Sequence, residues 1–422
     1  MGEQNTALIL LLVICLAVIS ISDIEIVKAE PKTIVVPDDF ASIQEAIDNS
    51  NEGDNVFVKS GTYHNQTVCI NKSLSLIGED SQTTILKSRP EITSFMLPNI
   101  TSVVEVKADN IRISGFTIDH YDRGISGSGN GTQIIGNIFT ANWDHTSINV
   151  LGSYIEITNN SIYGGRSNTG IHIGGSYNTI TDNKIVGTSA GIRLWGDSGT
   201  VSGNELIDSD QNGISVSGNL HTITQSNIIG GEIGLALICS GCVISENNIT
   251  EQTERAIWVD NTARDNVIRG NLLASNQGYA IYLTVLTGIE GPVNNTFYHN
   301  TIMDNGHNVH FTGSNQLNFW DSGHPSGGNY WSDYNGTDND GDGIGDTPYI
   351  IDENNRDNYP LMDPTIFPAS PSWTPMLIAL VAVVVIAVML MALVYGKRLA
   401  KLDHKLCVRA LLILCCTSIL VI

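Results

Sequence analysis

The chain has little positive charge. Its 422 residues contain 21 Lys and Arg against 43 Asp and Glu, and the formal net charge is −22 at pH 7. Proteins bind the phosphate backbone of nucleic acids through clustered Lys and Arg. The composition therefore argues against a nucleic-acid partner.

Cysteine is also scarce. Apart from the hydrophobic ends, the chain has only Cys69, Cys239 and Cys242, so no disulfide framework holds the protein together. Cys239 and Cys242 form a single CxxC motif. A local disulfide or two unpaired thiols is favoured over a metal site, because no second cysteine pair or nearby histidine completes a tetrahedral ligand set.

Long apolar runs occur only near the two ends. The run at residues 7–22 has the length of a signal peptide, but Glu3 and no Lys or Arg precede it, so residues 1–29 are interpreted as a signal peptide or an uncleaved anchor. Residues 375–395 carry no charge and are long enough to cross a bilayer as a helix. Lys and Arg follow directly in a tail, 396–422, that ends in a second, shorter apolar segment. The positive-inside rule then predicts an exported protein, anchored in the cell membrane, with its main domain outside the cytoplasm.

A short repeat fills the region between these ends. An Asn followed two positions later by an apolar residue recurs about every 23 residues, and a pair of apolar residues separated by one variable residue keeps the same interval. Two patterns in a fixed register predict a coil of stacked strands. The Asn positions are Asn137, Asn160, Asn183, Asn204, Asn247, Asn271 and Asn300.

Each repeat reads as three short strands with a bend at the Asn. Asn suits a sharp bend because it tolerates left-handed backbone angles, and its amide can bond the neighbouring turn. We expect a regular coil over 104–318, preceded at 30–103 by an irregular first turn and a short helix at 41–49 that covers the open end. An aromatic and acidic segment at 319–364 and a linker at 365–374 follow.

The coil has specific relatives. Its repeat pattern, with "TIVVPDDFASIQEAIDNSNEGDNVFVKSGTY" and "INKSLSLIGE", resembles the right-handed parallel β-helix proteins of the pectin-lyase-like class. Within that class it is similar to carbohydrate-binding and sugar-hydrolysis repeat domains and to NosD-like periplasmic proteins. The string "GGNYWSDY…DGDGIGDTPY…DNYPL" is similar to the C-terminal segment of NosD-like and archaeal surface proteins. The resemblance implies an all-β, right-handed parallel β-helix of about nine to eleven rungs with an N-terminal helical cap and a C-terminal transmembrane helix.

One outward face of the coil is the candidate binding surface. In pectin-lyase-like enzymes the active site lies on the strand that carries the apolar pairs, and the variable residue of each pair points outward there. Rungs are about 4.8 Å apart, similar to a sugar ring, so a polysaccharide lying along the coil would meet one residue per unit. The predicted carbohydrate-binding residues are His172, Arg193, Trp195, Trp258, Asp260 and Tyr282.

Evidence for catalysis is weaker. The outward column has no pair of carboxylates at the spacing that an inverting glycosidase needs. Loops that enter the face bring together acids, a Tyr and His that could abstract a proton from a uronic acid. These weak catalytic candidates are Asp119, His120, Tyr121, Asp122, Asp144 and His145.

Alternating acids in the C-terminal segment predict a metal site. Asp338, Asp340, Asp342 and Asp346 alternate with small residues, an arrangement that suits a hard cation, so we expect structural Ca²⁺, with a solvated acidic turn as the alternative. The loop is not an EF-hand, because Tyr349 stands where the bidentate Glu would be. Copper is not favoured. Only two of the candidate histidines, His307 and His310, are close to each other in sequence.

These patterns leave four functions open. The preferred one is a cell-surface protein that binds a polysaccharide or surface glycan without catalysis. The alternatives are a structural or adhesive surface-layer protein with a calcium-stabilised loop, a polysaccharide lyase or epimerase, and a NosD-like copper-related periplasmic protein. Several Asn-X-Ser/Thr sequons are compatible with a glycoprotein.

Overall fold

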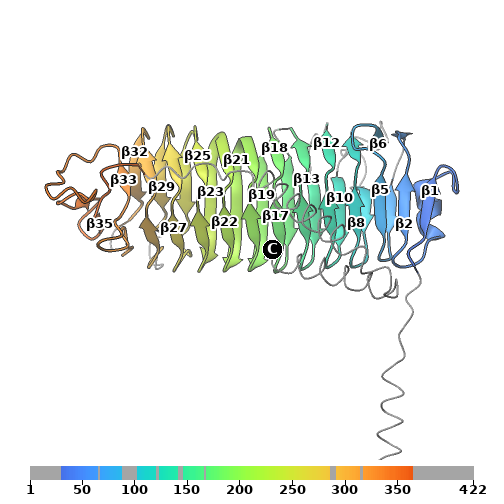
Figure 1. Ribbon diagram of the computed structural model, residues 1–422, viewed down its shortest axis with the longest axis horizontal. Helices are drawn as coiled ribbons and strands as arrows, with labels where there is room; N and C mark the ends of the chain where they lie inside the picture. Colours follow the sequence, from blue (N-terminus) through green and yellow to red (C-terminus); the bar gives the residue numbers. More distant parts are fainter. Residues whose placement is uncertain are drawn as a thin grey trace, which may run out of the picture. The chain divides into compact units, whose positions relative to one another are not determined.

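The fold is an all-β parallel solenoid of about ten turns (Figure 1). The computed structural model describes residues 30–64, 67–87, 102–119, 123–140, 146–165, 168–285, 291–313 and 317–364. The predicted signal or anchor at 1–29, linker, membrane span at 375–395 and tail lie outside these ranges. Within them, no helix has both the length and the apolar character needed to cross a bilayer.

One face of the coil is a 12-stranded parallel sheet. Its three-residue strands contribute one central inward-pointing apolar residue each, such as Ile157, Ile180 and Val201, which are fully buried. In stacking order they are β1 (Thr33–Val36), β2 (Asn55–Val58), β5 (Ser75–Gly78), β8 (Arg112–Ser114), β11 (Gln133–Ile135), β14 (Glu156–Thr158), β17 (Thr179–Thr181), β20 (Thr200–Ser202), β22 (Thr222–Thr224), β24 (Val243–Ser245), β27 (Val267–Arg269) and β30 (Thr296–Tyr298).

A second set of parallel strands carries the apolar pairs. These strands are β4 (Val68–Ile70), β7 (Ser102–Val106), β10 (Arg123–Ser128), β13 (Thr146–Leu151), β16 (Thr169–Gly174), β19 (Ala190–Asp197), β21 (Glu205–Asn219), β23 (Asn227–Ser240), β26 (Arg255–Val259), β29 (Tyr279–Leu283) and β32 (His307–Phe311).

The third set closes each rung. It consists of β3 (Gly61–Tyr63), β6 (Thr84–Lys87), β9 (Thr117–Asp119), β12 (Ile138–Thr140), β15 (Ser161–Tyr163), β18 (Lys184–Val186), the first residues of β21 and β23, β25 (Asn248–Thr250), β28 (Leu272–Ala274), β31 (Thr301–Met303) and β33 (Tyr330–Trp331).

The middle of the coil differs from the sequence-based expectation. Separate short strands were expected at 205–207 and 214–216, but β21 runs through the corner without a break, and β23 does the same. The two strands pair in parallel, with a register shift between Ser209 and Asn212. Backbone hydrogen bonding therefore continues around this corner in the central rungs.

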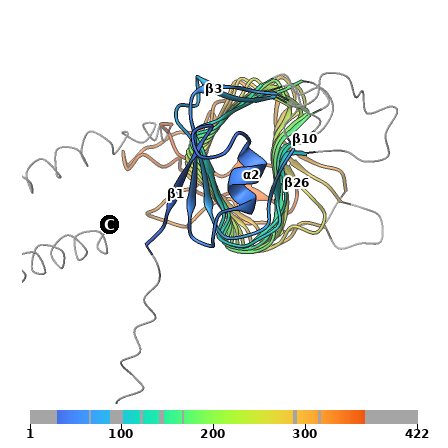
Figure 2. The same ribbon diagram turned by 90° about the vertical axis from the view of Figure 1, so that its right-hand side faces the viewer.

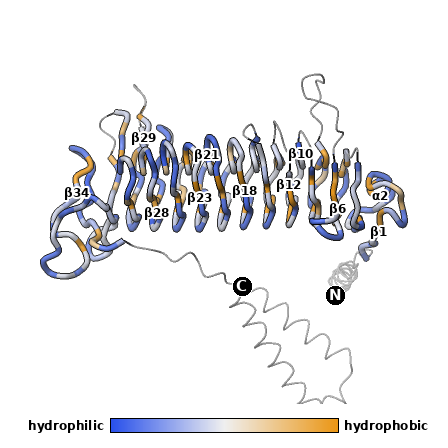
Figure 3. The backbone as a smooth tube through the Cα atoms, turned by 90° about the horizontal axis from the view of Figure 1, so that it is seen from above, coloured by the Kyte–Doolittle hydropathy of each residue, from blue (hydrophilic) through white to orange (hydrophobic). Residues whose placement is uncertain are grey.

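The core is a stack of aliphatic side chains. In the second set, Ile148, Ile171, Ile192 and Ile214 pair in register and have no exposed surface. Figure 3 shows hydrophobic stretches recurring in each rung along the whole coil. Burial of such columns is the main favourable term in the stability of the fold.

The N-terminal end carries one short helix, α2 (Ile43–Asp48). The Ser42 hydroxyl caps it by accepting a hydrogen bond from the Glu45 amide (3.3 Å). Ile43, Ala46 and Ile47 join the core cluster, and Figure 2 shows α2 at the open end of the coil. The helix is shorter than the predicted 41–49, and the described residues form no larger helical cap there.

Among the described residues, three ladders of buried or half-buried amides line the corners, where one was predicted. The predicted ladder is present: Asn160, Asn183 and Asn204 bond one another rung by rung at 3.0 Å. A second ladder contains Asn266, Asn295 and Asn318, and a third contains Gln252, Asn276 and Asn305. The CxxC motif lies beside the second ladder. Its two cysteines, Cys239 and Cys242, form a disulfide, as one of the predicted alternatives for this motif had it.

The C-terminal segment ends the coil with aromatic rings. Trp320 and Trp331 are almost completely buried, and Phe297 stacks on Trp320 with ring centroids 4.4 Å apart. A small antiparallel pair, β34 (Tyr349–Ile350) and β35 (Arg356–Asp357), follows. The rings cover the last turn of the apolar core, as expected from their position in the sequence.

Candidate functional site

The predicted outward column is present on the second set of strands. Strand register aligns its members, and the apolar residues on either side of each member point into the core. In order along the coil the column contains Asn149, His172, Arg193, Ser215, Ala236, Trp258, Tyr282 and His310.

Its C-terminal part is a cluster of rings around one guanidinium. The Arg255 Cζ atom lies 4.1 Å from the centroid of the Tyr282 ring and 5.8 Å from that of Trp258. The Tyr279 ring is 5.3 Å from the Tyr282 ring. Such a group offers flat apolar area together with hydrogen-bond donors. We call it the aromatic platform and define it as Arg255, Trp258, Tyr279, Tyr282, His307 and His310.

Sequence analysis missed half of this platform. Arg255, Tyr279 and His307 form a second outward column, three residues before the predicted one. Two consecutive residues between the columns, Ala256 and Ile257 in β26, are buried, so a strict alternation of inward and outward residues does not identify the second column. The sequence does contain a pattern that identifies this second column: its residues stand two positions before the first member of each apolar pair.

The N-terminal part of the face brings together three predicted residues. His172 pairs in register with Arg193, and the indole of Trp195 covers Gly174, where a Cβ atom would overlap it. Partial burial, and secondarily the Arg193 charge, lower the pKa of His172. Arg193 donates to the Gln211 side chain (3.3 Å), and Trp195 keeps 46% of its surface exposed.

Small side chains separate the two parts. Ser215 and Ala236 occupy the rungs between Arg193 and Trp258 in the same column. Three rung steps of about 4.8 Å give roughly 14 Å between these two residues. The face therefore carries an indole and a guanidinium at each end, with Ser215, the buried Ala236 and the exposed Ile238 between them.

Asp260, which was predicted to bind carbohydrate, forms hydrogen bonds within its own turn. Its Oδ1 atom accepts hydrogen bonds from the Thr262 amide (3.0 Å) and the Thr262 hydroxyl (2.8 Å). One carboxylate oxygen of Asp260 therefore accepts hydrogen bonds from within its own turn. Trp258 is fixed by a bond from its Nε1 to the Thr284 hydroxyl (2.7 Å).

The catalytic candidates lie mainly outside the described residues: His120, Tyr121, Asp122, Asp144 and His145 all belong to segments that the structure does not describe. Asp119 is described, and Lys87 Nζ contacts its Oδ2 atom at 3.0 Å. The Thr140 hydroxyl donates to its Oδ1 atom (2.8 Å). Both carboxylate oxygens are engaged, which is a poor arrangement for a general base.

A hollow of about 760 Å³ lies at the corner crossed by β21 and β23. Glycines open it, and Asp208, Asp210 and Glu232 supply carboxylates. Sequence analysis did not identify this hollow, because the acids are spread over two rungs and meet only through the stacking of the coil.

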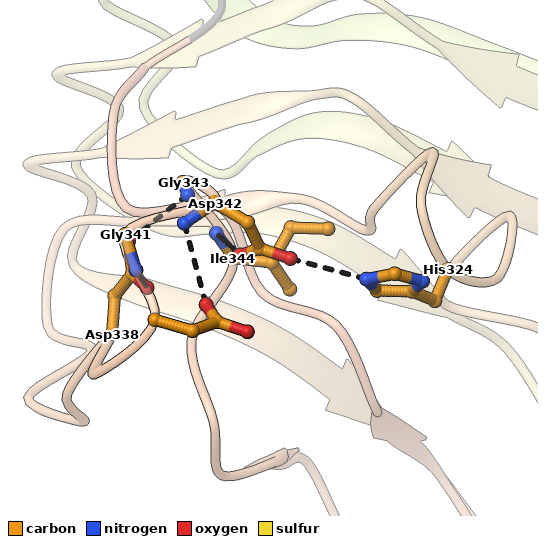
Figure 4. Close-up of polar contacts among 7 residues, drawn as sticks. His324, Asp338, Gly341, Asp342, Gly343 and Ile344 are labelled. Atoms are coloured by element: carbon orange, nitrogen blue, oxygen red, sulfur yellow. Dashed lines mark hydrogen bonds and ion pairs between the residues drawn. The ribbon is translucent and has the colours of Figure 1, made fainter.

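Three of the four predicted metal ligands come together. Asp338, Asp340 and Asp342 offer carboxylate oxygens within 4.8 Å of one another. Asp338 accepts from the amides of Gly343 (2.9 Å) and Gly341 (2.7 Å), and the Gly343 bond above all lowers its pKa (Figure 4). His324 Nε2 contacts Asp342 Oδ2 at 3.1 Å. The fourth predicted ligand, Asp346, binds the Asn339 amide (2.9 Å) and lies outside this group.

Part of the chain matches a known family. Residues 189–336 match the family described as periplasmic copper-binding protein (NosD), which confirms the resemblance predicted from the sequence. No curated protein sequence matches the chain significantly.

Solved structures with a similar fold include carbohydrate-active enzymes. The catalytic domain of a GH87 alpha-1,3-glucanase in complex with tetrasaccharides has 14% identity and a TM-score of 0.50, over 72% of this chain and 70% of that chain. A PL6-family alginate lyase, AlyGC, has 16% identity and a TM-score of 0.48, over 64% of this chain and 43% of that chain. At such identities the likeness shows the fold alone.

The described residues do not fit copper, which the family description names. Among them, the only group of three or more His, Cys, Asp or Glu with ligand atoms within 4.8 Å is Asp338, Asp340 and Asp342. Copper favours imidazole and sulfur ligands, whereas carboxylate oxygens suit hard cations. His120 and His145 lie outside the described residues.

Proposed function

We propose, from the similarity to NosD-like proteins and to β-helix carbohydrate-active enzymes, that the protein is exported and binds a carbohydrate chain along this outer face without cleaving it. The aromatic platform is the observation that carries the proposal. A sugar ring presents one apolar face and a rim of hydroxyls, and stacked rings beside Arg255 provide partners for both.

The shape of the face supports a polymer rather than a single sugar. Trp195 and Arg193 lie at one end and Trp258 and Arg255 at the other, and the column between Arg193 and Trp258 holds Ser215 and Ala236. A chain that crosses this interval would contact an aromatic ring at each end. Non-catalytic binding is favoured because Asp119, the catalytic candidate within the described residues, has both carboxylate oxygens engaged.

The test is glycan-array binding by the full-length protein in mild detergent. Replacing both indoles (Trp195→Ala with Trp258→Ala) removes a stacking contact at each end and is expected to weaken binding roughly tenfold or more. The matched control replaces Tyr163 and Phe319 by Ala, since both are exposed (44% and 50%) and neither lies on the second set of strands, which carries the proposed binding face. Unchanged binding by the Trp variant, with the fold intact by circular dichroism, rules out this face.

We further propose that Asp338, Asp340 and Asp342 hold a structural Ca²⁺. Their oxygens already lie within 4.8 Å of one another, and a ring of carboxylate oxygens is the environment that calcium prefers. Such a site would serve equally in a structural or adhesive surface protein. It would stabilise the loop that ends the coil.

Calcium is therefore expected to raise the melting temperature of the full-length protein relative to EGTA. A ligand at about a hundred times its Kd stabilises the folded state by about 2.7 kcal/mol. Asp340→Asn with Asp342→Asn is expected to abolish the shift, and the exposed Asp363→Asn is expected to keep it. Equal melting temperatures with and without calcium would refute the site.

A further inference from the structure

A polar hollow lies beside the end of the aromatic platform. It has a volume of about 300 Å³ and is bounded by the residues from Asp304 to Val309, by Ser332 and Asp333, and by the stretch from Tyr349 to Ile351. Its lining comes partly from β32 and from the residues directly after β33, and both strands lie at the C-terminal end of the coil (Figure 1). No prediction from the sequence included it, because its walls come from three separate segments.

Three side chains in the hollow hold one another in place. Asn308 Nδ2 donates to Asp333 Oδ1 (2.9 Å) and to the Tyr349 hydroxyl oxygen (3.1 Å). The Tyr349 hydroxyl in turn donates to Asp333 Oδ2 (3.1 Å). The Tyr349 ring stacks on Trp331 with centroids 4.3 Å apart, which fixes its position. Polar groups that are held in this way bind a ligand with little loss of side-chain entropy.

The hollow is continuous with the aromatic platform through His307. This residue lines the hollow, and its ring stacks on Tyr279 with centroids 5.0 Å apart. The Tyr279 ring also contacts His310 at 4.9 Å. A chain that lies on the platform therefore has the hollow directly at its end.

The charges of the hollow select the ligand. Asp304 and Asp333 supply carboxylates, and the residues that line it include no Lys or Arg. Carboxylates accept hydrogen bonds from sugar hydroxyls but repel the carboxylate of a uronic acid. Burial raises the pKa of Tyr349 to about 12, so its hydroxyl stays protonated at physiological pH and keeps its bond to Asp333, while its oxygen can accept from a sugar hydroxyl.

We infer that this hollow is a subsite for one neutral, hydroxyl-rich sugar unit at the end of the chain bound on the platform. The inference rests on the proposed function and deepens it. It names neutral glycans as the ligand class and the C-terminal end of the coil as the place where the bound chain stops.

Calorimetry with defined oligosaccharides tests the inference on the full-length protein in mild detergent. The probes are the pentasaccharides of maltose, cellulose, laminarin and mannan type, with pentagalacturonate and pentaguluronate as anionic counterparts. The wild-type protein is expected to bind a neutral probe more tightly than either uronate. Tyr349→Phe keeps the stacked ring but removes the hydroxyl, and is expected to weaken that binding about fivefold, the effect of one hydrogen bond.

Tyr298→Phe is the matched control, because Tyr298 lies on β30 in the 12-stranded sheet, outside the hollow, and no loss is expected. Replacing Asp304 and Asp333 together by Asn is expected to strengthen uronate binding. A preference of the wild-type protein for uronates would overturn the inference while leaving carbohydrate binding intact. The inference would also be overturned if Tyr349→Phe bound the neutral probe as tightly as the wild-type protein while the Trp195 and Trp258 double variant lost binding. Absence of binding to every probe would overturn both proposals.

Discussion

At the scale of single residues, buried amides make the corners of the coil. Asn183 is 1% exposed, and its Nδ2 atom donates to the carbonyl oxygens of Ile157 (2.8 Å) and Thr181 (2.9 Å) and to the next Asn in the ladder. Its Oδ1 atom accepts from the backbone amide of Asn160 (3.0 Å). One side chain thus satisfies backbone groups of two rungs that water cannot reach.

Asn183→Ala is expected to lower the free energy of unfolding by about 3 kcal/mol or more, because buried donors and acceptors lose their partners. Urea denaturation followed by circular dichroism measures the change. The control is Asn219→Ala, an exposed amide whose bond to Asp197 (2.9 Å) faces solvent, and a change below about 1 kcal/mol is expected there. Similar losses in the two variants would show that the ladder has no special role.

At the scale of elements, one buried acid ties β35 to β33, the strand that pairs with the last rung of the coil. Asp357 has no exposed surface; its Oδ2 atom accepts from the Asn329 amide (2.7 Å) and from Trp331 Nε1 (2.9 Å). Burial nevertheless dominates and raises the pKa of Asp357 to about 6. Strand β35, which contains this residue, is therefore attached through a group that titrates near neutrality.

The sign of the pH effect follows from that shift. Between its ordinary value of 3.8 and about 6, the folded state binds a proton that the unfolded state does not. The contribution of Asp357 to stability is therefore least favourable above pH 6 and improves as the pH falls toward 4. Tryptophan fluorescence reports on this region through Trp320 and Trp331.

We expect the melting temperature to rise more between pH 7 and pH 5 in the wild-type protein than in Asp357→Asn. The comparison with the variant removes the general effect of neutralising other carboxylates in so acidic a chain. Asp363→Asn, an exposed neighbour, is expected to keep the wild-type slope. Equal slopes in wild type and Asp357→Asn would contradict the assignment.

At the scale of the whole molecule, the coil is a one-dimensional stack. Each rung contacts its neighbours, so a column of outward residues becomes a continuous track along the axis. The formal net charge of −22 disfavours polyanions. The net charge therefore agrees with the proposal that a neutral glycan binds on the platform and in the hollow beside it.

The sequence alone determined the coil, its apolar pairs, one amide ladder and the outward face that carries His172, Arg193, Trp195, Trp258 and Tyr282. These features repeat at a constant interval, and a periodic pattern is local information that needs no tertiary contact to read. The helix at the N-terminal end was also predicted from a local apolar pattern, and it is shorter than the predicted 41–49.

Only the tertiary structure decided which residues meet across rungs. It added Arg255, Tyr279 and His307 to the face, and it paired Asp119 with Lys87 and Thr140 of the neighbouring rungs. It also built the hollow around Asp333 and Tyr349 from separate segments. The physical reason is that stacking brings together side chains more than twenty residues apart, and the loops and bulges that break the period decide which of them touch.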